Sequence, residues 1–204
     1  MLLGAVLLFE RGFAETFLER QTETGIVLAT AAMYLRLLII IALFNQPLAL
    51  AMAPPLIGLS ALGLLAAAAL YRAGWPRQHV ESPAGMPTNP LDLGAAAVFA
   101  ILFVAISIAS SWATQHFGDV GTYVLAAIVG VSDIDPFVLS LAQHGAGEIS
   151  GPVGVTAIQV ATSSNNLLKA AYTATYSGGR LRLRPVAALV ALAACGIGFA
   201  AALV

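Results

Sequence analysis

Charged residues are scarce in this chain. Only 9% of its 204 residues are charged, whereas a soluble domain carries about 25%. So few charges cannot cover the surface of a water-soluble globule with polar groups. The formal net charge is −1, which gives no positive field for binding nucleic acid. These two shortages exclude a soluble domain and a nucleic-acid partner.

Cysteine and catalytic motifs are also nearly absent. The single cysteine, Cys195, lies within an apolar run, so there is no intrachain disulfide and no Cys-x-x-Cys or Cys/His cluster. No P-loop, nucleophile elbow, zinc motif or dinucleotide fingerprint is present. We therefore expect a protein that is not an enzyme and that has no cofactor, a bound cation being the one exception to consider.

Long apolar runs, by contrast, are abundant. Hydrophobic residues make up 59% of the chain, the mean hydropathy is +0.90, and a membrane span needs about 20 apolar residues. The apolar segments are 25–44, 48–71, 93–117, 120–143, 153–176 and 186–204. They predict an all-α, polytopic transmembrane helical bundle of about six spans. The lipid bilayer is the expected partner, together with a second copy or another membrane protein.

This pattern predicts a simple domain organisation. Residues 24–204 are interpreted as a single transmembrane domain. Residues 1–23 are interpreted as an N-terminal segment that is a candidate truncated element.

Two basic loops conflict with a simple topology. Arg72 and Arg77 follow the second apolar segment, and Arg180 to Arg184 precede the last one. Basic loops favour the cytoplasmic face, but three single crossings would place these two on opposite faces. Either segment 120–143 is a broken or re-entrant helix that enters and leaves on one face, or one loop is an exception to the rule. The sequence favours neither alternative.

Two aspartates interrupt the fourth segment. Asp133 and Asp135 precede Pro136, and a carboxylate within a membrane helix costs roughly 2.5–3.5 kcal/mol. Because proline removes a backbone donor, upstream carbonyls are freed. Carboxylates and carbonyls are the oxygen ligands of hard cations, so this pair is a candidate metal or proton site. The alternative is an interfacial loop, where the two charges cost little.

Polar residues in the fifth segment form a second candidate cluster. Lys169 lies four positions after Asn165 and three after Asn166, so each asparagine is its neighbour on the helix surface. They either line the same cavity as the aspartates, with Lys169 as the charge partner, or join helices by hydrogen bonds and one buried ion pair. Arg36, in the middle of the first span, either pairs with a carboxylate of the fourth segment or extends to the interface.

The first and fifth segments share a faint similarity. Ala29-Thr30 followed by Leu35-Arg36 matches Ala161-Thr162 followed by Leu168-Lys169, with spacing that differs by one residue. Internal repeats are common in transporters, but two apolar helices also match this well by chance. The sequence alone favours chance.

Four motifs occur in order: Asn89 to Leu93, Phe117 to Tyr123, Gly130 to Pro136 and Asn165 to Lys169. Together they resemble the C-terminal membrane domain of unknown function attached to MgtC/SapB-type bacterial proteins. The resemblance spans about residues 24–204. It implies a multi-pass protein of the bacterial inner (cytoplasmic) membrane and, through the link of MgtC/SapB proteins to growth in low magnesium, ion transport.

The sequence thus leads to two functional hypotheses. The first is a transporter or channel-like protein for a small ion, either a divalent cation or a proton, with a polar centre built on Asp133, Asp135, Asn165, Asn166 and Lys169. The second is a non-catalytic regulatory or scaffolding membrane protein that binds the helices of a partner.

Overall fold

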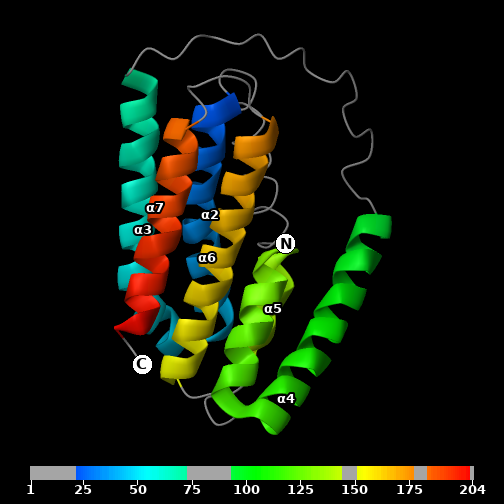
Figure 1. Ribbon diagram of the computed structural model, residues 1–204. Helices are drawn as coiled ribbons and strands as arrows, with labels where there is room; N and C mark the ends of the chain where they lie inside the picture. The colour runs from blue at the N-terminus through cyan, green and yellow to red at the C-terminus, as the bar shows by residue number, and fades with distance from the viewer. Residues whose placement is uncertain (1–21, 73–92, 144–150, 177–182, 203–204) are drawn as a thin grey trace.

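The computed structural model describes residues 22–72, 93–143, 151–176 and 183–202. All of its elements within these ranges are helices, arranged as an elongated bundle (Figure 1). They are α2 (Thr22–Phe44), α3 (Gln46–Arg72), α4 (Leu93–Gly130), α5 (Ile134–Gln143), α6 (Gly151–Tyr176) and α7 (Leu183–Ala201). The prediction of an all-α helical bundle is confirmed.

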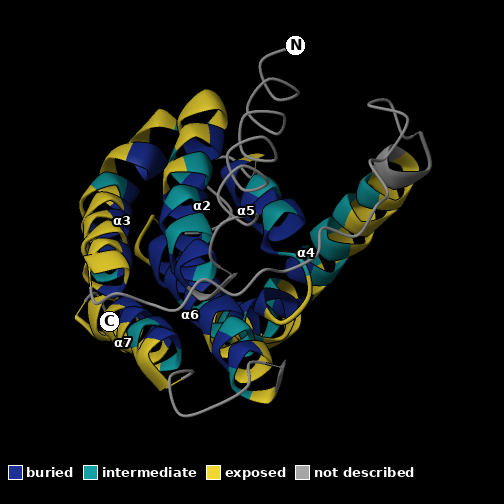
Figure 2. Ribbon diagram, turned by 90° about the horizontal axis from the view of Figure 1, so that it is seen from above, coloured by how far each residue is buried: buried dark blue, intermediate teal, exposed yellow. Residues whose placement is uncertain are grey.

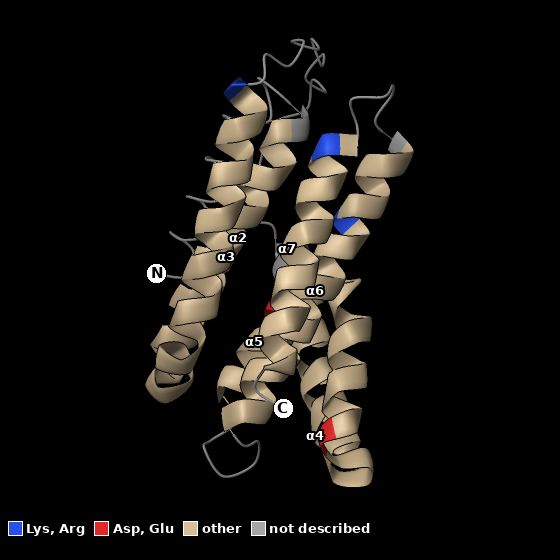
Figure 3. Ribbon diagram, turned by 60° about the vertical axis from the view of Figure 1, so that its left-hand side comes forward, with Lys and Arg blue, Asp and Glu red and all other residues tan. Residues whose placement is uncertain are grey.

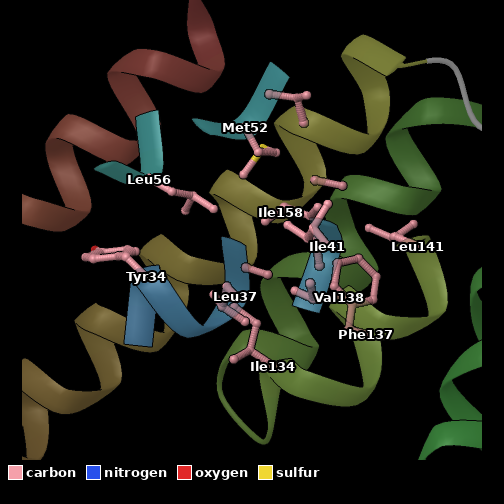
Figure 4. Packing of buried hydrophobic residues seen from close by; sticks show 14 of the residues in the cluster. Tyr34, Leu37, Ile41, Met52, Leu56, Ile134, Phe137, Val138, Leu141 and Ile158 are labelled. Carbon is pink, nitrogen blue, oxygen red and sulfur yellow. The ribbon is translucent and has the colours of Figure 1, made fainter. Parts of the chain in front are cut away.

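The core of the bundle is apolar and so is its outer surface. Fully buried side chains from several helices, among them Tyr34 and Leu37 of α2, Phe137 of α5 and Ile158 of α6, pack together in the interior (Figure 4). The outward faces are exposed (Figure 2) but carry large hydrophobic residues such as Leu50, which is 76% exposed. Because lipid rather than water suits such a surface, the protein is a membrane protein.

Among the described residues, four helices are long and apolar enough to cross a membrane: α2, α3, α4 and α7. Helix α6 lies alongside them and has 26 residues, which gives it a length of about 39 Å. Its buried polar side chains account for its lower hydropathy. Thus α6 matches the others in length, although its composition differs.

Helices α2 and α3 form an antiparallel pair joined at Asn45. The Asn45 side chain accepts a hydrogen bond from the backbone N–H of Leu48 at 3.0 Å and so caps the start of α3. Within the pair, Ser60 Oγ donates to the backbone oxygen of Ala31 at 3.0 Å. A Cβ added at Gly63 would lie 2.9 Å from Ala31 Cβ. Small residues therefore let these two helices approach closely.

Helix α4 contains a chain reversal at Gly118. This glycine has φ 58° and ψ −144°, a left-handed conformation that only glycine adopts at little cost. Thr114 Oγ1 and Thr122 Oγ1 lie 2.8 Å apart, whereas residues eight apart in a continuous helix are separated by about 12 Å. Residues 93–117 and 119–130 are therefore two helices, and they separate where the sequence divides the apolar segments 93–117 and 120–143.

Residues 119–143 form a helical hairpin that enters and leaves at the same end of the bundle (Figure 1). Its first arm, 119–130, ends against the middle of α6, where Gly130 contacts Asn165. The chain turns at 131–133 and α5 returns toward the end at which α6 begins. Of the two alternatives that the sequence left open, the structure shows the re-entrant segment. Among the described residues, the five helical segments outside the hairpin are α2, α3, 93–117, α6 and α7.

The hairpin removes the conflict between the basic loops. Arg72 is the last residue of α3 and Arg184 is the second residue of α7. Basic residues stand at the same end of the bundle on both helices (Figure 3). Only the segment 93–117 and α6 cross between them, because the hairpin does not. Both basic ends can therefore face the same side, as the charge rule for membrane proteins requires.

Candidate functional site

The end of the first hairpin arm is held by polar side chains of α6. Asn165 Nδ2 donates to the backbone oxygen of Gly130 at 3.1 Å, and Ser164 Oγ donates to that of Ala127 at 2.7 Å. The last carbonyls of any helix have no partner within the helix, and lipid offers them none at membrane depth. Asn165 and Ser164 therefore make it possible for a helix to end inside the bundle.

Asp133 caps the second arm. Its Oδ1 accepts a hydrogen bond from the backbone N–H of Asp135 at 3.1 Å, which is the geometry of an N-cap. A negative charge is also favoured at a helix N-terminus by the helix dipole. Asp133 is half-buried, so the interruption that the sequence placed at 132–136 is the hairpin tip and not a loop at the bundle's end.

Asp135 pairs with Arg36 of α2. Arg36 Nη2 lies 2.5 Å from Asp135 Oδ1, and the two side chains are only 15% and 14% exposed. Of the two alternatives that the sequence left open for Arg36, the structure shows the pairing with a carboxylate of the fourth segment. Because a single charge at this depth is costly, the pair ties the hairpin tip to α2.

The Lys169 side chain contacts α2 nearer to the start of that helix than Arg36 does. Its Nζ donates to Thr30 Oγ1 at 3.4 Å and to Met33 Sδ at 3.3 Å. Thr30 and Met33 precede Arg36 by six and three residues, which is about 9 and 4.5 Å along the helix axis. The sequence predicted Lys169 as the partner of Asp133 or Asp135, and the structure shows an ion pair of Asp135 with Arg36.

Asn166 joins α6 to α2 through Tyr34. Its Nδ2 donates to the phenolic oxygen of Tyr34 at 2.5 Å, and Tyr34 is completely buried. Sequence reasoning did not select Tyr34. The signal available was a phenol in the middle of an apolar span, where its hydroxyl needs a polar partner.

One face of α6 carries buried polar atoms that lack a hydrogen-bond partner. Thr156, Gln159, Ser163 and Asn166 recur at helical spacing, and each is at most 3% exposed. Within the described residues, the atoms of this face without a partner are Thr156 Oγ1, Gln159 Nε2, Ser163 Oγ and Asn166 Oδ1. Buried polar groups of this kind call for water or an ion as a partner.

Most of these unpartnered atoms of α6 are oxygens. Asn165 Oδ1 is buried and unpartnered as well. Among the described residues, no three acidic, histidine or cysteine side chains come together as metal ligands. Asp135 is engaged by Arg36, so Asp133 is the carboxylate of the tip without a basic partner among the described contacts. A cation here would rely on amide and hydroxyl oxygens of α6, with Asp133 as the carboxylate.

The chain matches a known family over most of its length. The model of a family described as a domain of unknown function, DUF4010, matches residues 6–177, a range that includes the hairpin and α6. The predicted resemblance is thereby confirmed for the domain of unknown function, while the association with MgtC/SapB proteins stays a prediction.

A relative and the solved structures add little about function. An uncharacterized protein of Aquifex aeolicus (strain VF5) is 36% identical over 124 residues, which are 60% of this chain and 54% of that protein. The matched region thus spans about half of the relative's length. No solved structure matches the chain.

Proposed function

The chain belongs to the DUF4010 family, and we propose that it is a membrane transporter that moves a small cation through the polar centre between α2, the hairpin tip and α6. The observation that carries the proposal is the re-entrant hairpin, whose tip lies against the middle of α6 and contacts Asn165 there. Non-helical backbone at membrane depth is tolerated only when protein buries it or when it lines a polar cavity. Discontinuous helices in transporters serve as ion and substrate sites in this way.

The chemistry of the buried atoms supports a cation as the ligand. Ser163 Oγ, Asn165 Oδ1 and Asn166 Oδ1 are buried oxygens without hydrogen-bond partners, and oxygen is the preferred ligand of hard cations. A divalent cation would use these oxygens together with Asp133. A proton would need only Asp133 as a relay group, with water reaching it. These are the two cations to test first, and neither route requires enzymatic chemistry.

The distribution of basic residues supports an orientation. The ends of α3 and α7 that carry Arg72 and Arg184 lie together (Figure 3), and clustered basic residues favour the cytoplasmic side. We place that end in the cytoplasm and the hairpin's entry at the opposite face. The bacterial inner membrane is the location that the resemblance to MgtC/SapB-associated domains supports.

The test is a flux measurement with the purified chain in liposomes. The panel contains H⁺, Na⁺, K⁺, Mg²⁺ and Ca²⁺, and we compare the parent with Asp133→Asn. Asparagine caps a helix as well as aspartate does, so this change removes the charge and keeps the cap. Asp119→Asn is the matched control, because Asp119 is an exposed carboxylate beside the Gly118 turn.

We expect the parent and Asp119→Asn to conduct one of these cations and Asp133→Asn to lose that flux. A parent that moves none of them faster than empty liposomes do would contradict the proposal.

A second candidate function is binding of partner helices by a regulatory or scaffolding protein. One observation favours it. In the apolar stretch of α4 only 11% is buried inside the bundle, against 44% in those of α2 and α3. Its exposed residues include Ile101 and Ile108, which are 68% and 65% exposed. If the liposomes show no flux and polar substitutions at Ile101 and Ile108 change the size of the assembly, this second function is favoured.

A further inference from the structure

The helix pairs α2–α3 and α6–α7 are similar in sequence when α6 is aligned 132 positions after α2. In this ungapped register Ile26, Ala29, Thr30 and Leu35 coincide with Ile158, Ala161, Thr162 and Leu167. The two threonines also behave alike, because Thr30 Oγ1 donates to the backbone oxygen of Ile26 and Thr162 Oγ1 to that of Gln159. Such bonds to the preceding turn are common for threonine in a helix, so the similarity of α2 and α6 rests on the identical residues.

The second helices of the two pairs make the same close contact. A Cβ at Gly63 of α3 would lie 2.9 Å from Ala31 Cβ of α2, and a Cβ at Gly196 of α7 would lie 2.5 Å from Ser163 Oγ of α6. Ser163 follows Ala31 by 132 positions and Gly196 follows Gly63 by 133. In both pairs, a glycine at the corresponding position allows the two helices to approach closely.

The buried faces of α3 and α7 agree in the same register. Each buried residue of α7 has a buried counterpart 133 positions earlier in α3. The pairs are Met52/Pro185, Leu56/Leu189, Leu59/Leu192, Ser60/Ala193, Gly63/Gly196 and Ala67/Ala200. Four of these six pairs are identical residues, which a shared helical period alone does not require.

The two copies are inverted with respect to each other. Along α6 from Asn166 to Lys169, the contacts on α2 move backward from Tyr34 to Met33 and Thr30. Helices α2 and α6 therefore run in opposite directions, as Figure 1 also shows. Tyr34 and Asn166 are counterparts 132 positions apart, and they bind each other. A two-fold axis exchanges counterparts, so two counterparts can contact each other only close to the axis. The Tyr34–Asn166 contact therefore marks the position of the axis.

We infer that α2–α3 and α6–α7 form an inverted repeat whose axis runs through the Tyr34–Asn166 contact, and that the cation passes this contact with access from each membrane face in turn. The inference rests on the proposed function and adds its mechanism. Inverted repeats place ion sites at their interface near the bilayer midplane, and rocking of one copy against the other opens each side alternately. Asn166 Oδ1, which is buried without a partner, is then a ligand atom at the axis.

Thr30 and Thr162 are the positions that test this mechanism. They are counterparts, both completely buried, and they lie on opposite sides of the Tyr34–Asn166 contact. Thr30 lies toward the end that carries Arg72 and Arg184, and Thr162 toward the opposite end. Alternating access therefore requires that each becomes reachable from a different face of the membrane.

The experiment uses the full chain with Cys195→Ala and a single new cysteine, Thr30→Cys or Thr162→Cys, in sealed vesicles. A membrane-impermeant maleimide is applied from either face. We expect Thr30→Cys to react only from the face that carries Arg72 and Thr162→Cys only from the other. The counterparts Ala31→Cys and Ser163→Cys repeat the test if a threonine variant does not reach the membrane.

Matched controls come from the lipid-facing side of the repeat. Ile57 and Val190 are counterparts on α3 and α7 and are 51% and 44% exposed, so their cysteine variants should react from neither face. Reaction of both threonine positions from the same face, from both faces, or from neither overturns the inference. Cation flux without opposite-face reactivity would leave the proposed function intact, whereas opposite-face reactivity without flux of any tested cation would contradict only the choice of cation.

Discussion

Arg36 and Asp135 lie 99 positions apart in the chain and meet at 2.5 Å inside the helical bundle. Arg36 belongs to a helix that crosses the bundle, and Asp135 to the first turn of the short helix that leaves the hairpin tip. The pair compensates two charges that would each be costly at this depth. It also ties the first turn of α5 to α2.

The Arg36–Asp135 pair should be worth more to stability than any surface pair. Breaking one partner of a buried pair costs about 3–5 kcal/mol, and we expect Arg36→Leu to lose about 3 kcal/mol because both side chains keep some exposure. Asp135→Leu added to Arg36→Leu should recover much of this loss. Unfolding in mixed micelles measures both changes, with Arg72→Leu at the exposed end of α3 as the control.

A second double-mutant cycle compares how strongly Lys169 and Arg36 are coupled to Asp135. The structure pairs Asp135 with Arg36 and directs Lys169 toward Thr30 and Met33. We therefore expect the changes in unfolding free energy caused by Lys169→Met and Asp135→Asn to be nearly additive. Those caused by Arg36→Leu and Asp135→Asn should depart further from additivity. Stronger coupling of Asp135 to Lys169 than to Arg36 would show that Lys169 is the true partner.

Site-directed labelling should reveal the hairpin in the membrane. Cysteines at Asp119 and Gln143, one at each foot of the hairpin, are expected to react with an impermeant reagent from the same face. A cysteine at Arg72 should react from the opposite face. Reaction of the two feet from opposite faces would mean that the segment crosses the membrane and that one basic loop is an exception to the charge rule.

Gly130 should not tolerate a side chain. A Cβ there would lie against the backbone oxygen of Ala161 and 2.8 Å from Ser164 Cβ, so the arm would have to move away from α6. We expect Gly130→Ala to destabilise the protein by about 1–3 kcal/mol, as overpacking does. Gly58→Ala is the control, since nothing lies within 4 Å of its added Cβ. The control should be neutral or stabilising by up to about 1 kcal/mol, and an equal effect of both changes would argue against the close contact at Gly130.

Much of the fold could be predicted because its signals are local. The apolar runs, the turn at Gly118 and the polar interruption at Ser132 to Pro136 are properties of neighbouring residues. The two basic loops raised the alternative of a re-entrant segment, but the sequence did not favour it over an exception to the charge rule. The tertiary structure shows the re-entrant segment.

The candidate site was predicted less completely. Asn165 and Asn166 were selected for their polarity, but their separate roles were not predicted. Asn165 binds the end of the first hairpin arm, and Asn166 binds Tyr34. Tyr34 was missed, since an aromatic residue in an apolar span is ordinary by composition. The sequence attributed the internal similarity to chance because the shared positions of burial and the contact between counterparts are visible only in the tertiary structure.

The sequence by itself determined that this is a helical membrane protein with a broken segment and a polar fifth span, because composition and helical period are properties of contiguous residues. Only the tertiary structure decided that Asp135 binds Arg36 and that Lys169 lies toward Thr30 and Met33. Which charges meet depends on the rotation and depth of each helix. Those are set by close contacts between distant residues, such as Gly63 with Ala31 and Gly196 with Ser163.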